Sequence, residues 1–195
     1  MVKKCLLKLL NNILLIDPIK DIERNNMSVI LYIFSGLPGS GKSTLAKEIA
    51  KKLKAVYIRI DTVEQGIRDL CNFKVEGEGY RLSYKIAEDN LKIGNSVIAD
   101  SCNPIKLSRD EWENVAISNN CKYMNIEIIC SNKIEHKNRV EKRISEVKNL
   151  KLPTWDQVVK REYEEWDRNH ITIDTANKNI EDCKNELLNK LITST

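Results

Sequence analysis

The sequence lacks the cysteine pattern of a disulfide-stapled or metal-binding domain. Its six cysteines are scattered over 195 residues, with no C-x-x-C pair and no histidine at metal-ligand spacing. Several of them lie in apolar runs, which is typical of buried free thiols in a reducing cytoplasm. A run of 18 apolar residues, as a membrane-spanning helix requires, is also missing. We therefore expect a cytoplasmic protein with neither a disulfide framework nor a metal-ligand cluster.

Charge of one sign is not in large excess. The chain has 32 Lys and Arg against 28 Asp and Glu, a formal net charge of +4, which permits a nucleic-acid partner but does not argue for one. Repeats and low-complexity tracts are missing too. The length, with 42% hydrophobic and 31% charged residues, is typical of a single globular domain with one core.

The first 27 residues differ from the rest. Val2–Ile16 is basic at its start and rich in leucine, but a lysine and two asparagines interrupt it and no small-residue cleavage site follows, which opposes a signal peptide. Two interpretations stay open: a peripheral amphipathic helix that packs on the domain, a partner or a membrane surface, or a natural start at Met27. The domain itself is expected to span residues 28–195.

Residues 36–44 (GLPGSGKST) match the phosphate-binding loop pattern G-x-x-x-x-G-K-[ST]. Glycines let successive N–H groups turn inward on an anion, and a helix that begins at the end of the loop adds its dipole. Lys42 is expected to reach the β- and γ-phosphates, and the Ser43 hydroxyl to bind Mg²⁺. An apolar run precedes the loop and an amphipathic helix follows it, as the motif requires. The predicted nucleotide-phosphate site consists of Gly36, Pro38, Gly39, Ser40, Gly41, Lys42, Ser43 and Thr44.

Strand-like and helix-like segments alternate along the chain. Strands are expected at residues 29–35, 55–60, 96–99, 123–130 and 171–173. Helices are expected at residues 42–54, 62–70, 80–93, 108–118, 132–147, 154–166 and 181–191, the fourth of them because Ser108 and Glu111 have capping-box spacing. This alternation predicts an α/β fold with a mostly parallel sheet and helices on both faces.

Two aspartates follow predicted strands, where open α/β sheets bind their ligands. Asp100 suits a carboxylate that orients Mg²⁺ through water, or it caps the turn before the Asn103-Pro104 pair. Asp61 follows the second strand, where it can take the proton of an attacking hydroxyl. It can also cap the next helix, and the two roles are compatible.

Arg139 and Arg143 lie four residues apart in the helix expected at 132–147, and so on one face of it. Such a pair can clamp phosphate oxygens, where charge spreads during transfer. A solvated basic face is the alternative, because several lysines lie nearby. Lys151 and Arg161 are secondary candidates, and the two isolated histidines are expected to be surface or structural residues.

The guanine-binding pattern N-K-x-D is missing. Its nearest spellings, at residues 132–135 (NKIE) and 177–180 (NKNI), lack the aspartate, so ATP is the expected phosphate donor. The chain is also too short for a motor or a ring-forming ATPase with its sensor subdomain.

The sequence resembles the small P-loop kinases grouped as the AAA-33 or zeta-toxin-like ATPases, which include chloramphenicol phosphotransferase, gluconate kinase and polynucleotide kinase domains. The likeness covers about residues 29–191. Beyond the loop it rests on residues 60–68 (IDTVEQGIR), 97–104 (VIADSCNP) and 136–143 (HKNRVEKR). Residues 152–166 and 173–176 look like an uncharacterised bacterial branch of this group.

The resemblance implies a five-stranded parallel sheet of order 2-3-1-4-5, with a small helical lid at about residues 132–166 that carries Arg139 and Arg143. It implies that the loop from Thr175 to Lys178 borders the adenine. The residues that it places around the acceptor are Asp61, as the base, with Arg68, Tyr84 and Asn103.

The expected function is ATP- and Mg²⁺-dependent transfer of a phosphoryl group to a hydroxyl of a small molecule, such as a metabolite or an antibiotic. Three alternatives stay open: a polynucleotide 5′-kinase with an acceptor groove lined by Arg and Lys, a toxin that phosphorylates a nucleotide-sugar, and a non-catalytic switch whose lid closes on ATP for a protein partner. Members of the resembled group phosphorylate very different acceptors, so the resemblance does not identify the substrate.

Overall fold

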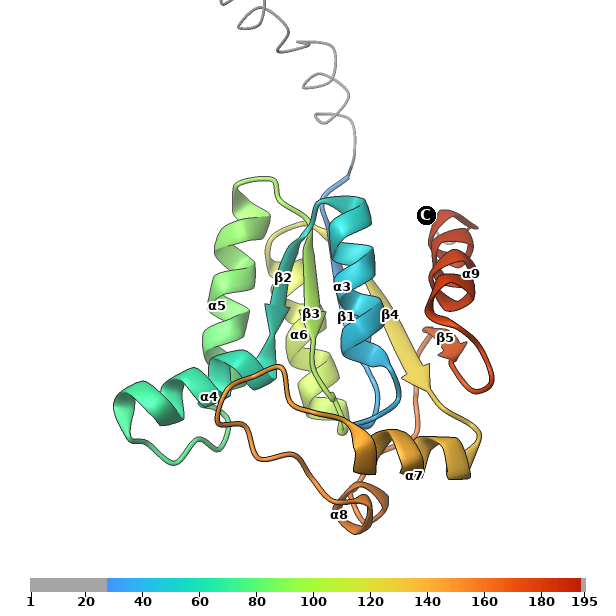
Figure 1. Cartoon of the computed structure of the whole chain (residues 1–195). Helices are drawn as coiled ribbons and strands as arrows, with labels where there is room; N and C mark the ends of the chain where they lie inside the picture. Colours follow the sequence, from blue (N-terminus) through green and yellow to red (C-terminus); the bar gives the residue numbers. More distant parts are fainter. Residues whose placement is uncertain (1–27, 194–195) are drawn as a thin grey trace, which may run out of the picture.

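The computed structural model describes residues 28–193, so the N-terminal extension of the sequence lies outside the described residues. Five strands form one sheet: β1 (Ile30–Ser35), β2 (Val56–Arg59), β3 (Val97–Asp100), β4 (Lys122–Ile129) and β5 (Ile171–Asp174). Their order is β2-β3-β1-β4-β5, and every neighbouring pair is parallel (Figure 1). This architecture confirms the expected α/β fold and strand order.

Seven helices are described within residues 28–193: α3 (Lys42–Leu53), α4 (Ile60–Cys71), α5 (Glu78–Lys92), α6 (Lys106–Ser118), α7 (Lys133–Lys142), α8 (Trp155–Val159) and α9 (Ile180–Thr193). Figure 1 shows α4, α7 and α8 at the end of the sheet to which the strand arrows point. Within this described part of the chain, no helix combines the length and apolar character that crossing a bilayer requires.

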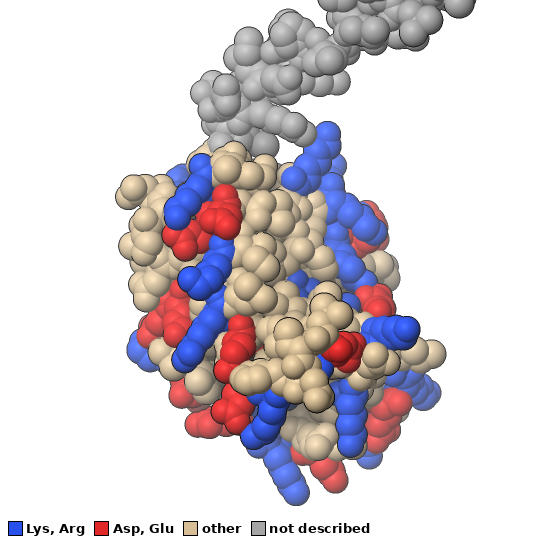
Figure 2. Space-filling model, turned by 90° about the vertical axis from the view of Figure 1, so that its left-hand side faces the viewer, with Lys and Arg blue, Asp and Glu red and all other residues tan. Residues whose placement is uncertain are grey.

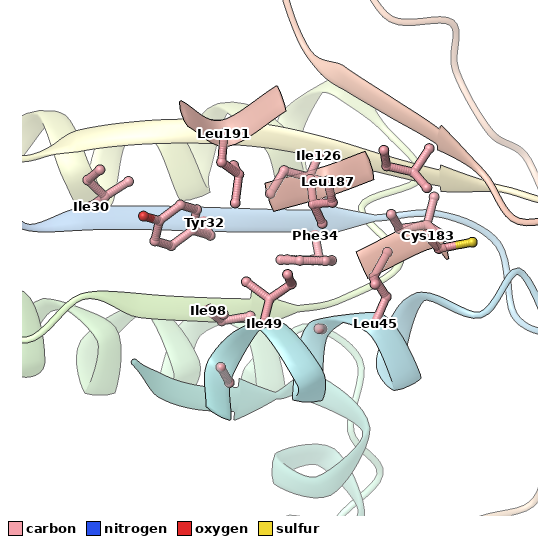
Figure 3. Close-up of a cluster of buried hydrophobic side chains, with 14 residues drawn as sticks. Ile30, Tyr32, Phe34, Leu45, Ile49, Ile98, Ile126, Cys183, Leu187 and Leu191 are labelled. Atoms are coloured by element: carbon pink, nitrogen blue, oxygen red, sulfur yellow. The ribbon is translucent and has the colours of Figure 1, made fainter. Parts of the chain in front are cut away.

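The sheet is covered on both faces because its central strand is apolar on both. Successive side chains of a strand point to opposite faces. Tyr32 and Phe34 of β1 pack with α3 and α9, whereas Leu31 and Ile33 pack with α5 and α6. Figure 3 shows the first of these two cores, in which Leu45 and Ile49 of α3 and Leu187 and Leu191 of α9 meet the sheet. The phosphate-binding loop thus joins the central strand to a helix that is packed firmly on the sheet.

We predict that Leu187→Ala destabilises the domain by about 2–5 kcal/mol, because it removes a fully buried side chain and leaves a cavity. Unfolding in urea, followed by circular dichroism, measures the loss. Ile192→Ala is the matched control, since Ile192 lies on the same helix but is 75% exposed. Equal, small effects of the two substitutions would contradict the packing of α9 on the sheet.

The segment predicted to form a lid, residues 132–166 and called the lid below, is less helical than expected. The helix predicted at 132–147 ends at Lys142, because Arg143 adopts an extended conformation and the Ser145 hydroxyl bonds within its own turn, to the carbonyl of Val147. Ile144 has no core to bury into and is 91% exposed. The helix is therefore shorter than predicted, but the amide of Arg143 still donates to the carbonyl of Arg139, so the two arginines stay one turn apart as predicted.

The second lid helix is also shorter than predicted. It ends at Val159 rather than near Trp166, because tertiary hydrogen bonds take the backbone groups that a longer helix would use. The amide of Glu164 donates to the carbonyl of Pro104, and Arg109 binds the carbonyls of Glu164 and Glu165.

Two helix starts differ from the predictions. Helix α6 begins at Lys106, so Ser108 is inside its first turn and bonds the carbonyl of Ile105 instead of forming a capping box with Glu111. Helix α4 begins at Ile60, which places Asp61 in the first helical turn rather than at the end of a strand.

Candidate active site

A cavity of about 970 Å³ opens beyond the carboxyl ends of the strands. The phosphate-binding loop, the first turns of α4, the loop after β3, the lid and the loop after β5 form its walls. Ligands of open parallel sheets bind at this edge. The predicted residues that line it are Gly36, Pro38, Gly39, Gly41, Lys42, Ser43, Thr44, Asp61, Arg68, Arg139, Arg143, Thr175 and Lys178. The structure therefore brings most of the predicted site together.

The phosphate-binding loop needs its glycines for conformation and for space. Gly41, with φ of 94°, lies in the left-handed region and immediately precedes the first residue of α3. A Cβ on Gly36 would lie 2.2 Å from the carbonyl oxygen of Ile128 on β4. Because Gly41 has no side chain to cap α3, no cap accepts from the N–H groups of the first helical turn, and a phosphate in the loop can do so.

Asp100 lies at the base of this loop and is almost completely buried. Lys42 donates through Nζ to Oδ1 of Asp100, and the Tyr57 hydroxyl donates to Oδ2 over 2.5 Å. Burial raises the pKa of Asp100, but Lys42, Tyr57 and the Ser43 hydroxyl outweigh it and hold this pKa below its usual range. The Ser43 and Asp100 oxygens, which lie side by side, are ligand types that Mg²⁺ prefers, so these residues fit the ion.

We predict that Tyr57→Phe lowers stability at pH 7 by about 1.5–3 kcal/mol, the usual worth of a hydrogen bond to a charged group. Because the pKa of Asp100 is lowered on folding, this contribution is complete above about pH 4 and declines as the pH falls through the lowered value. Urea unfolding at pH 7 and at lower pH measures both. An equal loss at every pH would contradict the ionised state of Asp100.

Three side chains brace the phosphate-binding loop from outside: Thr175, Arg139 and His136. The Thr175 hydroxyl lies 2.7 Å from the carbonyl oxygen of Ser40, and Arg139 donates to that hydroxyl over 2.7 Å. His136 Nε2 lies 2.9 Å from the carbonyl oxygen of Pro38. Arg139 thus braces the loop at the cavity wall, and its role in neutralising phosphate charge stays a prediction. His136 was expected to be a surface or structural histidine. Its contact with Pro38, 98 residues earlier in the chain, could not be predicted from local sequence.

Two carboxylates face the cavity from α4. Asp61 is exposed in the first turn, and Glu64 lies one turn further along, where its carboxylate accepts from Arg68 over 2.9 Å. Burial raises the pKa of Glu64, although Arg68 opposes this. Glu64 was not predicted as a site residue. It is a second group that can accept a proton from a bound hydroxyl.

Three guanidinium groups gather around the acceptor side of the cavity, from Arg59, Arg143 and Arg161. Arg143 is half-buried, and its pKa is lowered by burial and by the two other arginines, while Asp61 raises it. The buried Nε atoms of Arg59 and Arg143 have no hydrogen-bond partner among residues 28–193. A cluster of like charges with two unsatisfied donors suits an anionic ligand, as the transferred phosphoryl group is.

Two predicted acceptor residues lie elsewhere. Tyr84 packs edge-on against Trp112 in the core, with ring centroids 4.6 Å apart, and Tyr80, one turn earlier on α5, lines the cavity instead. Asn103 is fully buried, where its amide nitrogen donates to the carbonyl of Phe34 and to the Ser35 hydroxyl. Asn103 therefore stabilises the loop after β3, and its side-chain amide forms hydrogen bonds inside the protein rather than with a ligand.

The surface around α4 and α5 carries charges of both signs. Figure 2 shows Lys and Arg interspersed with Asp and Glu on this face, without one continuous basic area. The net charge of +4 is therefore not concentrated there. This face does not supply the basic stripe that a nucleic-acid-binding surface requires.

A family model described as "Chromatin associated protein KTI12" matches residues 27–195. The chain belongs to the KTI12 family. A solved structure of Kti12 from Chaetomium thermophilum, in complex with ADP-AlF3, superposes with a TM-score of 0.62 at 20% identity, over 84% of this chain and 97% of that chain. At this level of identity the likeness shows the shared fold.

Curated relatives of this KTI12-family chain include two kinases. An adenylyl-sulfate kinase of Prochlorococcus marinus is 29% identical over 184 residues, which is 87% of this chain and 86% of that protein. An L-seryl-tRNA(Sec) kinase of Methanococcus maripaludis is 29% identical over 180 residues, which is 84% of this chain and 65% of that protein. The Mycobacterium tuberculosis APS kinase, in complex with AMPPNP and APS, shares the fold with a TM-score of 0.65 at 16% identity.

These comparisons confirm that the chain is a P-loop kinase-like NTPase of the nucleotide-binding class. The family model that matches is KTI12, and the narrower assignment to the AAA-33 group stays a prediction.

Proposed function

We propose that this chain transfers the γ-phosphoryl group of ATP to a hydroxyl of a small molecule, with Mg²⁺ as cofactor. One observation carries the proposal: the phosphate-binding loop lines one side of a single cavity, and Asp61 lines the other side together with several arginines. A donor site that faces a candidate base and cationic groups has the parts that phosphoryl transfer requires.

In the proposed reaction the loop and the start of α3 hold the phosphates, and Lys42 leaves Asp100 to contact them. The acceptor oxygen forms a bond to the γ-phosphorus as the bond from that phosphorus to the β–γ bridging oxygen breaks, which releases ADP. The hydroxyl proton passes to Asp61. Arg143 and Arg161 offset the charge on the transferred group. Ser43 and Asp100 would hold Mg²⁺, which would supply positive charge to the bound triphosphate.

The names of the curated relatives support a kinase but not one acceptor. One phosphorylates adenylyl sulfate by name and the other L-seryl-tRNA(Sec), so the group's acceptors differ widely. The acceptor side of this cavity is formed in part by the lid residues Leu150, Leu152 and Pro153, beside charged groups of α4. Such a mixed lining favours a compact acceptor with polar and apolar parts.

The experiment is incubation of purified protein with ATP, Mg²⁺ and a metabolite and antibiotic pool, followed by mass spectrometry for a phosphorylated product. We expect one acceptor class to gain phosphate as ATP is consumed. Consumption of ATP to ADP and inorganic phosphate, with no phosphorylated product in any pool, would contradict transfer to a small molecule.

A second candidate is a non-catalytic switch that senses ATP. Its support is the direct contact of the lid with the donor site: Glu146 of the lid pairs with Lys47 of α3 over 2.6 Å and with Arg59 of β2 over 3.0 Å. A nucleotide that disturbs these pairs changes the position of the lid. Binding of a protein partner that depends on ATP, persists without turnover and disappears in Lys42→Ala would favour this function over transfer.

A further inference from the structure

We propose that Arg109 is a positioning residue that holds Arg161 in place for phosphoryl transfer, an inference that rests on the proposed phosphotransferase function. Arg109 lies on α6, outside the cavity, and is fully buried. Arg161 lines the cavity from the irregular connection between α8 and β5, residues 160–170.

The guanidinium of Arg109 ties two loops together through their backbones. Its Nε donates to the carbonyl of Asn103 over 3.1 Å, in the loop that follows β3. Its Nη1 and Nη2 donate to the carbonyls of Glu165 and Glu164, over 3.1 and 2.7 Å, in the α8–β5 connection. These bonds all go to backbone carbonyls, so they determine where the chain runs rather than pair a charge.

Aromatic rings and a backbone bond complete this clamp. The guanidinium lies 4.2 Å from the centroid of the Trp166 ring and 5.3 Å from that of Tyr163. The amide of Glu164 donates to the carbonyl of Pro104 over 2.8 Å, which joins the same two loops a second time. The connection is thus held by side-chain and backbone contacts in place of regular secondary structure.

Both loops that Arg109 joins reach the cavity. Cys102, next to Asn103, lines the cavity and lies against Arg161, and its carbonyl accepts from the amide of Gly36 in the phosphate-binding loop. A shift of the connection would therefore move Arg161 relative to the bound phosphates. Displacement of a charged donor by about 1 Å is enough to lower the rate about 10²-fold.

A buried arginine is an unfavourable residue for holding a loop unless the geometry of its guanidinium group is required. Burial of a guanidinium costs hydration free energy, which good hydrogen bonds to every N–H direction must offset. The planar fork of arginine holds its donors at fixed, widely spaced positions that match these carbonyls on two loops, whereas the three donors of a lysine ammonium share one nitrogen and cannot reproduce this spacing. The guanidinium group of Arg109 therefore determines the position of the α8–β5 connection.

The test is the affinity for MgADP with fluoroaluminate, which mimics the phosphoryl group in transfer and needs no acceptor. Arg161→Ala is expected to weaken this affinity about 10²-fold, the usual cost of losing one donor to a transition-state oxygen. Arg109→Lys is expected to weaken it about 10-fold, with the affinity for ADP alone changed less than about twofold.

Two further variants separate positioning from general stability. In the Arg161→Ala background, Arg109→Lys should have almost no additional effect, because the two changes then act through one interaction. Arg168→Lys is the matched control: Arg168 lies further along the same connection and pairs with Asp110 and Glu113 of α6, away from the donor site. It should leave the affinity for the analogue unchanged.

Additive losses in the double variant would overturn the positioning role and leave the phosphotransferase proposal standing. A wild-type protein that binds the analogue no more tightly than ADP would contradict the phosphotransferase proposal, and the role of Arg109 with it. If Arg109→Lys does not fold, Trp166→Leu, which removes the stacked ring, replaces it in the same cycle with the same two outcomes.

Discussion

Lys42→Ala is expected to lower the rate of phosphoryl transfer by at least about 10³-fold, because the transferred group loses its cationic partner in a site where electrostatic stabilisation supplies most of the catalysis. The rate of ADP formation at saturating ATP and acceptor measures this loss. Lys51→Ala, on the exposed side of α3 where Lys51 pairs with Glu48, is the control and should leave the rate unchanged.

The same substitution has an effect on stability that must be separated from the effect on rate. Removal of Lys42 takes away the cation that donates to buried Asp100 and leaves only Arg59, whose Nε lies 4.0 Å from Oδ2; breaking a buried ion pair usually costs about 3–5 kcal/mol. The double variant Lys42→Ala with Asp100→Asn removes both charges, so it should regain stability but no activity. Recovery of activity together with stability would show that Lys42 acts only in folding.

Asp61→Asn is expected to lower the rate of transfer about 10²- to 10⁴-fold while the KM for ATP changes little, because general base catalysis typically contributes that factor and the donor site is untouched. Asp89→Asn is the control and should leave the rate unchanged, since Asp89 is an exposed aspartate of α5 that does not line the cavity.

Glu64→Gln distinguishes the two carboxylates of α4. Glu64 lies one turn from Asp61, and burial raises its pKa, as suits a group that receives a proton. If Asp61→Asn leaves the rate of transfer unchanged and Glu64→Gln lowers it strongly, Glu64 rather than Asp61 is the base. Large losses in both would indicate that Glu64 holds Arg68 and the acceptor while Asp61 takes the proton.

The fold was predictable because its signals are local. Each central strand is a short apolar run, since both its faces are buried, and a glycine-rich loop between such a run and a helix has few alternatives. The strand order came from the resemblance, not from periodicity. The lid was predicted poorly because its helices are polar, so their ends depend on contacts with distant residues such as Pro104 and Arg109 rather than on local pattern.

The residues of the candidate site that belong to a sequence motif were predictable. Residues that come together from distant parts of the chain were less so. Lys42, Ser43 and Asp100 follow from the loop and the strand end, and the structure places them in contact. Tyr84 was predicted at the acceptor, but Tyr80, one turn earlier on the same face of α5, is the ring that lines the cavity, because it lies nearer the helix end beside α4. Glu64, His136 and Arg109 carry no sequence signal, since their partners are defined by tertiary structure.

The measurement that tests the central claim most directly follows the γ-phosphate itself. ATP labelled at the γ-phosphorus is incubated with Mg²⁺, the metabolite and antibiotic pool, and either the wild-type protein or Asp61→Asn. We predict that the wild type moves the label onto a hydroxyl compound and that Asp61→Asn does so at least about 10²-fold more slowly. Label that stays in ATP or appears only as inorganic phosphate, while the nucleotide demonstrably binds, would contradict the account and favour an ATP-sensing switch.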